Sequence, residues 1–203
     1  MIILIRHGQT NENKNGINQG QTDSFLNKTG KMQAEKAAEF LKDYSINVAF
    51  SSDLKRAAET MNIIMKYHKD AEIYYDKRLR ERKLGVFEGS KDGSLMKAAK
   101  ENGLSFFEFK PEGGESVGEF RKRVVECFNE IKNKYSNKNV LIVTHGGTII
   151  NILREYYKIT EENFKKYLPG NTAITIINNN KVEVLNSLEH LPESLKTRKG
   201  IDP

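Results

Sequence analysis

Two histidines stand in the same local setting although they lie 138 positions apart. His7 and His145 each follow a short apolar run and precede a glycine, and Arg6 comes directly before the first of them. An imidazole can act as a nucleophile near neutral pH, because its unperturbed pKa is about 6.5. A guanidinium group stays charged and binds phosphate through two hydrogen bonds. Together these residue types are suited to the transfer of a phosphoryl group.

A third apolar run supplies another cation. Val48–Phe50 leads through a pair of serines to Arg56, and a helix that begins near Asp53 would place Arg56 in its first turn. The N–H groups and the positive dipole end of a helix N-terminus also favour an anion. A lone histidine after a strand, or a lone arginine in a helix, is usually structural or exposed. Two His-Gly strand ends beside an arginine-bearing helix are not explained in that way.

The elements around these residues predict that they meet. Met1–Arg6 and Val140–Thr144 are almost wholly apolar, as strands buried on both faces of a sheet are. Apolar runs alternate with helical patterns along the chain, which predicts βαβ units and a parallel sheet. Ligands bind at the carboxyl ends of such strands. We therefore expect the two histidines and the two arginines to form one cationic cluster at that edge.

Periodicity and capping signals predict the remaining elements. Further strands are expected at Ile73–Tyr75, Ala173–Ile177 and Val182–Leu185, the last two as a hairpin. Helices are expected at Gly30–Lys42 after Thr29 as cap, at Asp53–Tyr67 after Ser51 or Ser52, from the capping box Ser116-x-x-Glu119 to Tyr135, and at Gly147–Tyr157. These elements predict a three-layer α/β/α fold with a mostly parallel central sheet. We expect a single domain over residues 1–203 with a small, partly helical cap insertion at about residues 86–115.

Composition limits the class of protein. Of 203 residues, 37% are hydrophobic and 30% are charged, as in soluble globular proteins. The N-terminus does not have the pattern of a signal peptide, and no apolar run approaches the roughly 18 residues of a membrane span. Cys127 is the only cysteine, which indicates a reducing compartment and hence a cytoplasmic location. The net charge of +6 is scattered, so neither nucleic acid nor a membrane is expected as a partner.

The motifs resemble those of the histidine phosphatase superfamily, the phosphoglycerate-mutase-like proteins, over nearly the whole chain. The first signature is Arg6-His7-Gly8-Gln9-Thr10, with Asn13, Gly16 and Gln19-Gly20 after it. The later blocks are Ser52-x-Leu54-x-Arg56-Ala57-x-Glu59-Thr60, Leu79-Arg80-Glu81 with Gly85 and Glu88-Gly89, Gly113-Gly114-Glu115-Ser116, and Val143-Thr144-His145-Gly146. An Arg-His-Gly triplet alone would be a weak match, whereas these blocks in this order make a specific one.

The resemblance implies a role for each matching residue. His7 would be the nucleophile that carries a transient phosphohistidine. The phosphate oxygens would be held by Arg6, Arg56 and His145, and the pocket would be lined by Asn13, Gln19, Gly20 and Gly146. Glu81 would donate the proton to the leaving alcohol.

Glu88 competes with Glu81 for the acid role, and we interpret it as a structural carboxylate because Glu81 matches the family register. No metal or other cofactor is expected, since arginine and histidine would supply the positive charge. Of the other titratable residues, His68 and His190 are expected to face the solvent, and Cys127 to be a small core residue.

The same core serves hydrolases and mutases, and two features favour a hydrolase. The segment between Gly89 and Pro111 has only 21 residues, which is short for the insertions that shield a mutase intermediate from water. The block Glu81-Arg82-Lys83-Leu84-Gly85 lacks the His and Tyr of the mutase-like Glu-Arg-His-Tyr-Gly pattern. Glu12 and Ile17 also stand where many members carry Trp and Arg.

We therefore expect a metal-independent phosphatase that hydrolyses small phosphate monoesters, of the broad-specificity or α-ribazole-phosphate type, with a small phosphorylated metabolite as its partner. A cofactor-dependent phosphoglycerate mutase is the first alternative. An inert phospholigand-binding regulatory protein is the second, and the presence of all five core residues argues against it. The sequence makes no prediction about oligomeric state.

Overall fold

The order of the strands brings the three predicted apolar runs side by side. In the computed structural model, which describes residues 1–197, six strands form one sheet in the order β3-β2-β4-β1-β5-β6. The strands are β1 (Ile2–Arg6), β2 (Val48–Ser51), β3 (Glu72–Tyr75), β4 (Val140–Thr144), β5 (Ile174–Asn178) and β6 (Lys181–Ser187). The first four run parallel, whereas β5 pairs antiparallel with β1 and with β6. The prediction of a mostly parallel sheet is confirmed.

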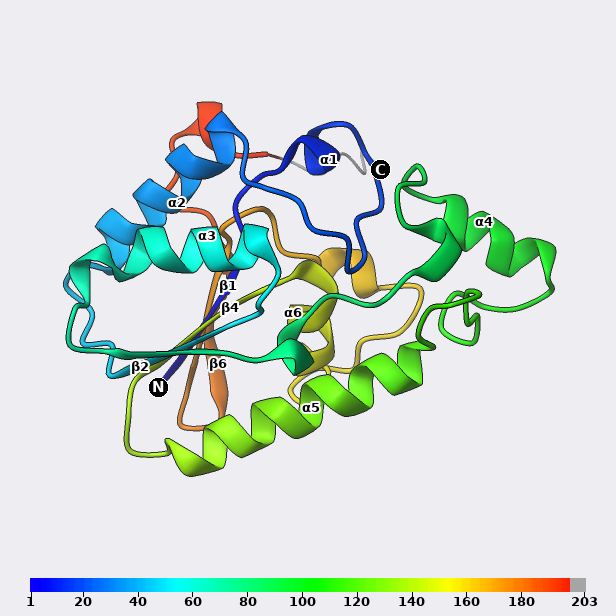
Figure 1. Cartoon of the computed structure of the whole chain (residues 1–203). Coiled ribbons are helices and arrows are strands. Elements are labelled where there is room, and N and C mark those ends of the chain that lie inside the picture. Colours follow the sequence, from blue (N-terminus) through cyan, green and yellow to red (C-terminus); the bar gives the residue numbers. More distant parts are fainter. Residues whose placement is uncertain (198–203) are drawn as a thin grey trace.

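Helices cover both faces of this sheet. The α-helices are α1 (Asn11–Lys14), α2 (Lys28–Leu41), α3 (Lys55–Ile64), α4 (Ser94–Glu101), α5 (Val117–Lys134) and α6 (Gly146–Leu153). Short 3-10 turns lie at Met65–Tyr67, Lys77–Leu79, Gly85–Phe87, Phe164–Tyr167 and Glu193–Leu195. Helices α2 and α3 pack on one face, and α5 with α6 on the other (Figure 1). The predicted three-layer α/β/α architecture is therefore confirmed.

The central strands owe their position to residues that are apolar on both sides. In β1, Ile3 and Ile5 belong to the core beneath α2 and α3, whereas Ile2 and Leu4 belong to the core beneath α5. All five residues of β4 are buried as well. Strands of this kind are stable only between two helical layers, so β1 and β4 are held in the middle of the sheet and both end at the same edge.

Several helix boundaries differ from those predicted, and three of the differences have a clear cause or extent. Helix α2 begins at Lys28, because the side-chain oxygen of Asn27, rather than Thr29, accepts the N–H of Gly30 at 2.8 Å. Helix α3 begins at Lys55 after Leu54, which makes no side-chain cap. The prediction of a serine cap was wrong because Ser52 is directed toward His145 instead. Helix α6 ends at Leu153, four residues before the predicted Tyr157.

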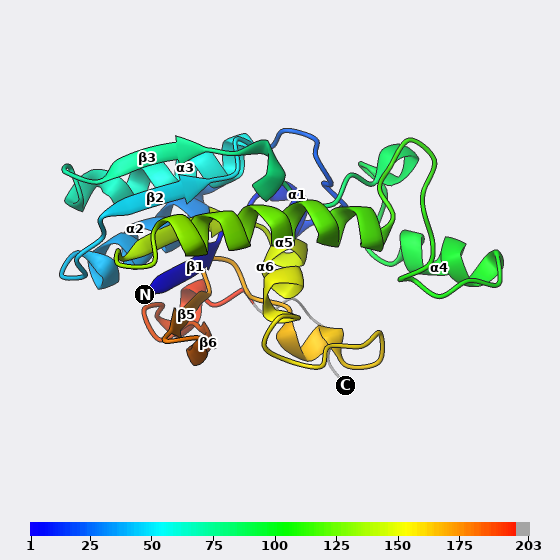
Figure 2. The same ribbon diagram turned by 90° about the horizontal axis from the view of Figure 1, so that it is seen from below.

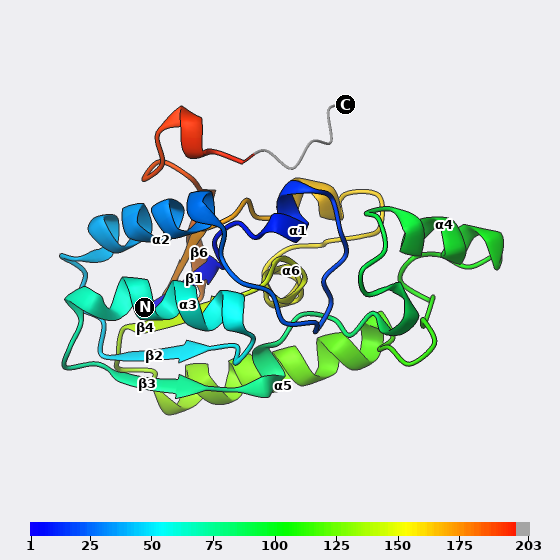
Figure 3. The same ribbon diagram turned by 45° about the horizontal axis from the view of Figure 1, so that its top comes forward.

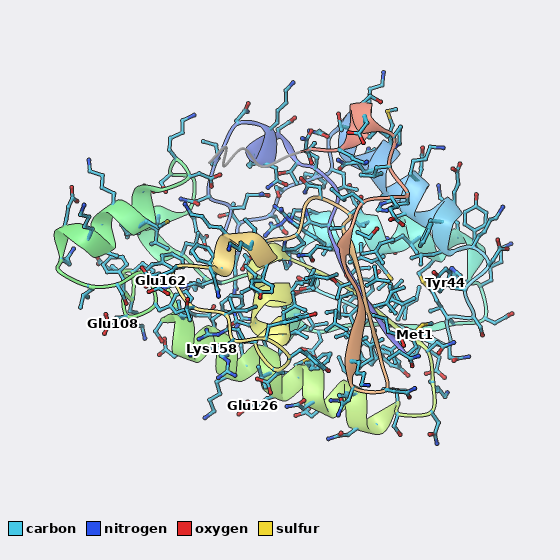
Figure 4. The ribbon with its side chains drawn as sticks, turned by 180° about the vertical axis from the view of Figure 1, so that it is seen from behind. Met1, Tyr44, Glu108, Glu126, Lys158 and Glu162 are labelled. Atoms are coloured by element: carbon cyan, nitrogen blue, oxygen red, sulfur yellow. The ribbon has the colours of Figure 1, made fainter. Side chains whose placement is uncertain are left out.

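The segment expected to form the cap lies at one end of the molecule. Helix α4 projects beyond one end of the strands, opposite the end at which the chain's N-terminus lies (Figure 2). The chain then returns toward the body, where the backbone N–H of Phe106 donates to the carboxylate of Glu161 at 2.9 Å. Glu108 and Glu162 accordingly lie at one end in Figure 4, opposite Met1 and Tyr44. The cap is thus fastened to the segment that follows α6.

Candidate active site

The side chain of His7 is anchored through one of its two nitrogens. His7 follows the last residue of β1 and is only 3% exposed. Its Nδ1 lies 2.8 Å from the carbonyl oxygen of Gly8, and since a carbonyl can only accept, Nδ1 carries the proton in this arrangement. The lone pair of the neutral ring is then on Nε2. His7 also borders the main cavity of the protein, so this arrangement suits a nucleophile.

His145 lies directly behind His7. The two ring centroids are 5.2 Å apart, and His145 follows β4 at the point where α6 begins. Its Nε2 is 2.8 Å from the hydroxyl of Ser52, while its buried Nδ1 has no partner among residues 1–197. Burial, together with nearby Arg56, lowers the pKa of His145 well below 6.5. The ring is therefore neutral at neutral pH and has one nitrogen available to hold a ligand oxygen.

Two buried guanidinium groups are held by carbonyl oxygens. Arg56, in the first turn of α3, donates to the carbonyl oxygens of Thr22 and Gly20, both at 2.8 Å. Arg6 donates to the carbonyl oxygen of Pro169 at 2.7 Å. Burial lowers the pKa of both groups, that of Arg56 to about 10, so both remain charged at neutral pH. The Nε atom of each is buried without a partner in the described chain, as a site prepared for an anion would require.

Glu81 faces the same cavity from the other side. Its Oε2 accepts the backbone N–H of Gly147 at 2.9 Å, at the N-terminus of α6, and its Oε1 accepts the N–H of Arg82 at 2.8 Å. A side chain on Gly147 would place its Cβ 2.3 Å from Oε1, so this contact requires glycine. Arg123 fixes the backbone, because it donates to the carbonyl oxygen of Glu81 at 2.8 Å. Together these contacts hold the carboxylate at the wall of the cavity that His7 also borders.

Glu88 has a different environment. Its carboxylate accepts the N–H groups of Gln21 and Leu84 and the hydroxyl of Thr22 at 2.8 to 3.1 Å, and it does not border the cavity. A Cβ on Gly20, whose φ is +52°, would lie 2.4 Å from this carboxylate. Glu88 therefore fastens the loop that carries Gly20 to the segment after β3, and its place is structural.

Three of the four predicted pocket residues border the cavity. The oxygen of the Asn13 side chain accepts N–H groups from Thr10 and Asn171, and that of Gln19 accepts the hydroxyl of Ser24 at 2.6 Å. Asn13, Gln19 and Gly20 line the cavity wall. Gly146 does not, and neither does His145; both are buried behind the wall. The structure therefore brings the predicted cluster together, with Gly146 and His145 in its buried part and the other residues at the cavity wall.

One polar residue of the site, Asn171, was not singled out from the sequence, and a second, Ser52, was placed in a motif without a contact to His145. Asn171 donates from its side-chain amide to the carbonyl oxygen of His7 at 3.1 Å, and Ser52 contacts His145. Asn171 lies in a turn after the 3-10 segment, and Ser52 was interpreted only as a possible helix cap. The prediction that His190 and His68 face solvent was also wrong: His68 is buried, and the half-buried His190 lies 3.1 Å from the hydroxyl of Thr172.

The cavity continues from these residues toward the cap. Its volume is about 880 Å³, and its distant wall is made by Phe106, Phe107 and Phe164. Arg82 ties the cap to the body, since it donates to the carbonyl oxygens of Glu115 and Phe109 and stacks on Phe106 at 5.3 Å. The cavity thus has a cationic end at the sheet and an aromatic end under the cap.

Two further features are absent from residues 1–197. No group of three or more His, Cys, Asp or Glu side chains in that range is arranged to hold a metal ion. None of the helices described there is both long and apolar enough to cross a bilayer.

Comparisons with known proteins agree with this geometry. The model of the histidine phosphatase superfamily (branch 1) matches residues 2–185. The broad-specificity phosphatase YOR283W of Saccharomyces cerevisiae is 36% identical over 184 residues, which cover 87% of this chain and 78% of that protein. The metal-independent phosphoserine phosphatase of Arabidopsis thaliana is 36% identical over 166 residues, covering 79% and 68%.

Solved structures show the same likeness. A mutant phosphoserine phosphatase of Entamoeba histolytica, in complex with phosphoserine, superimposes with a TM-score of 0.78 at 27% identity and covers 94% of this chain and 98% of that one. The family match, these relatives and the shared fold show that the chain belongs to branch 1 of the histidine phosphatase superfamily and is a phosphatase, a hydrolase of phosphoric monoesters.

Proposed function

We propose that the protein hydrolyses small phosphate monoesters through a phosphohistidine formed on Nε2 of His7. The observation that carries this proposal is the setting of His7. Its Nδ1 is anchored to the Gly8 carbonyl, and it shares the cavity wall with two buried guanidinium groups that are held by carbonyl oxygens. A nucleophile in a fixed orientation beside buried positive charge is the arrangement that phosphoryl transfer needs.

In the first step, the lone pair of Nε2 attacks phosphorus and the bond from phosphorus to the ester oxygen breaks. The electron pair of that bond goes to the leaving alcohol, which takes a proton from Glu81. Arg6 and Arg56 hold equatorial oxygens, where charge spreads in the transition state, and the partnerless Nδ1 of His145, buried next to His7, is proposed as the third contact. Positive charge that is already in place needs no reorganisation during the reaction.

In the second step, water attacks the phosphohistidine. Glu81, now ionised, accepts a proton from that water, the bond from phosphorus to Nε2 breaks, and inorganic phosphate leaves. The segment at the phosphate-binding end of the cavity contains Asn13, Gln19 and Gly20, and the carbonyl oxygen of Gly20 holds Arg56. The residues themselves supply the charge and the proton transfers, which agrees with the metal independence for which the relative from Arabidopsis thaliana is named.

The substrate is proposed to be a small phosphorylated metabolite, on the strength of what the relatives are named for. A phosphoserine phosphatase and a fructose-2,6-bisphosphatase are among them. We also keep as proposals the single domain over residues 1–203, with its cap insertion at about 86–115, and a cytoplasmic location. The single cysteine, Cys127, which is buried in the core, supports the latter.

The test is a His7→Ala variant assayed for phosphate release from 4-nitrophenyl phosphate. We expect a loss of at least about three orders of magnitude in kcat, since the nucleophile itself is removed. Rapid acid-free quenching of the wild-type protein during turnover should trap a phosphoenzyme that is labile to acid and stable to base. His190→Gln is the matched control, because it changes a histidine outside the cavity.

Retention of more than trace activity in His7→Ala, or absence of the phosphoenzyme, would overturn the covalent mechanism. The same protein is assayed for conversion of 3-phosphoglycerate to 2-phosphoglycerate with a bisphosphate primer. Transfer that exceeds hydrolysis would replace the proposed phosphatase reaction by a mutase reaction on the same histidine.

A further inference from the structure

One face of α6 runs along the cavity from the catalytic end to the cap. Gly147, Ile150, Asn151 and Arg154 all border the cavity, and their spacing of three and four residues places them on one side of the helix. Figure 3 shows α6 end-on between the sheet and the cap. Given the rise of an α-helix, Asn151 lies about 6 Å and Arg154 about 10 Å beyond Gly147.

Asn151 presents an acceptor to the cavity that no group of the described chain uses. Its side chain is 4% exposed, and its Nδ2 donates to the carbonyl oxygen of Gly147 at 3.0 Å. This bond fixes the orientation of the amide, because a carbonyl can only accept. Oδ1 is therefore the atom that is buried without a partner in residues 1–197. A buried acceptor of this kind is expected to meet a donor, and the cavity is where a ligand would bring one.

Arg154 supplies a cation at the far end of the same face. Its guanidinium group lies over the ring of Phe107, 4.9 Å from the centroid, and it is half-buried. It makes no ion pair with any described residue, and the neighbouring carboxylate of Glu155 is taken by Arg121 at 2.6 Å. A guanidinium group that stacks on an aromatic face keeps its edge available for two hydrogen bonds to an anion.

Beside these two polar positions the cavity wall is apolar. Ile150 forms it on the α6 side, and the cap adds Phe106, whose ring stacks on Phe164 at a centroid distance of 5.8 Å and 12° between planes. The backbone of Phe106 is held by Glu161. This aromatic wall is therefore fixed to the body and can serve as a surface for a flat or apolar part of a substrate.

We infer that Asn151 and Arg154 form a subsite that recognises the leaving group of an elongated phosphate monoester. The leaving group of this class has an apolar or aromatic body next to the ester oxygen, then an N–H or O–H that donates to Asn151, and an anionic end that binds Arg154. A carboxylate or a second phosphate would satisfy the last position. This inference rests on the proposed function, because it takes the ester oxygen to lie beside Glu81 and Gly147.

The experiment uses three matched aryl phosphates: 4-phosphonooxybenzoylglycine, its glycinamide, which lacks the terminal charge, and the glycolate ester, which lacks the N–H. Wild-type protein should show at least tenfold higher kcat/KM for the acid than for the glycinamide. Arg154→Met should abolish that ratio. Asn151→Leu should lower the preference for the amide-linked acid over the glycolate ester, while leaving the acid-to-glycinamide ratio largely intact.

Lys165→Met is the matched control, because Lys165 is a second cation at the cavity wall outside α6. The subsite assignment would be overturned if Lys165→Met abolishes the acid-to-glycinamide ratio of kcat/KM and Arg154→Met does not. It would also be overturned if wild-type protein has no preference for the acid. Ratios between probes on one variant are insensitive to a general loss of folded protein. Activity of wild-type protein on 4-nitrophenyl phosphate separates the two proposals, since its absence would contradict the phosphatase mechanism itself.

Discussion

Two groups of arginines within residues 1–197 differ in the partners that hold them. Arg78, Arg80 and Arg123 pair with carboxylates, and the pKa of the first two is raised by those partners. Arg6 and Arg56 are instead held by carbonyl oxygens in buried positions, and burial lowers their pKa. A carbonyl oxygen orients a guanidinium group without neutralising it, so the second group keeps its charge for a phosphate.

Replacement of Arg56 by lysine tests this division. Lysine keeps a positive charge, but its three N–H groups lie on one nitrogen and cannot reproduce the planar fork that contacts Thr22 and Gly20 from two different nitrogens. We expect Arg56→Lys to lower kcat/KM by about 10²- to 10³-fold, the cost of losing one oriented donor at a transition state. The measurement is steady-state hydrolysis of 4-nitrophenyl phosphate beside a thermal melt. Arg78→Lys, away from the cavity, is the control and should stay within twofold; an Arg56→Lys variant that also stays within twofold would show that charge alone matters.

Glu81→Gln tests the proton donor through the leaving group. An alkoxide needs a proton to depart, whereas 4-nitrophenolate hardly does. We expect kcat to fall about 10²- to 10⁴-fold for an alkyl phosphate, the usual contribution of a general acid, and far less for 4-nitrophenyl phosphate. Glutamine can still accept the N–H of Gly147 but no longer that of Arg82, so a thermal melt of the variant accompanies the assay. Equal losses on both substrates would remove Glu81 from the acid role.

At the residue scale, the sequence revealed side chains that stand in recognisable motifs and missed those that act through turns. His7, Arg56 and His145 follow strands or open a helix, and each is part of a spaced block. Asn171 reaches His7 only because the chain returns to β1 as an antiparallel neighbour. Such a contact depends on backbone geometry far along the chain, and no local pattern encodes it.

At the scale of elements, the strands were predicted well because burial on both faces leaves an unbroken apolar run. The capping box of α5 was also found: Ser116 and Glu119 bond each other's backbone N–H groups. Boundaries set by tertiary contacts were not found. Ser52 was expected to cap α3, but the fold places it against His145, and the distant partner outweighs the local cap.

The close approach of α2 to the loop after His7 can be tested by a substitution at Gly30. A Cβ on Gly30, in the first turn of α2, would lie 2.1 Å from the carbonyl oxygen of Gln9 in the loop after His7. Gly30→Ala must push backbone away from backbone, so we expect a loss of about 2 kcal/mol or more in the free energy of unfolding. Activity should fall with it, because the same loop carries the nucleophile.

Gly118→Ala is the control for that change. Gly118 also lies in the first turn of a helix, α5, but its Cβ would meet nothing nearer than 3.9 Å. Alanine there should be neutral or stabilise by up to about 1 kcal/mol, since it reduces the freedom of the unfolded chain. Urea unfolding of both variants measures the difference. If the two alanines shift stability equally, the contact between α2 and the loop is not rigid.

At the scale of the whole molecule, the strand order explains why distant residues share one site. Because β2, β4 and β1 are parallel neighbours, Ser52, His145 and His7 emerge at one edge of the sheet. The cap closes the cavity from the far side, and α6 joins the two ends. The sequence could predict the shared edge, since parallel strands end together, whereas the cap contacts of Phe106 and Phe107 depend on side-chain packing that has no periodic signal.

The histidines also make the stability of the whole fold depend on pH. Burial lowers the pKa of His190 to about 4, whereas an unfolded chain binds the same proton at about 6.5. Between these values the unfolded state binds more protons than the native state, so stability is complete above pH 6.5 and is lost as the pH falls toward 4. Since His190 is only half-buried, we expect its share of the loss between pH 7 and pH 5 to be about 1 kcal/mol. Urea unfolding of wild type and His190→Gln at both pH values isolates this share, because His68 and His145 titrate in both proteins. A variant that loses as much stability as wild type on acidification would show that the environment of His190 beside Thr172 does not exclude the proton.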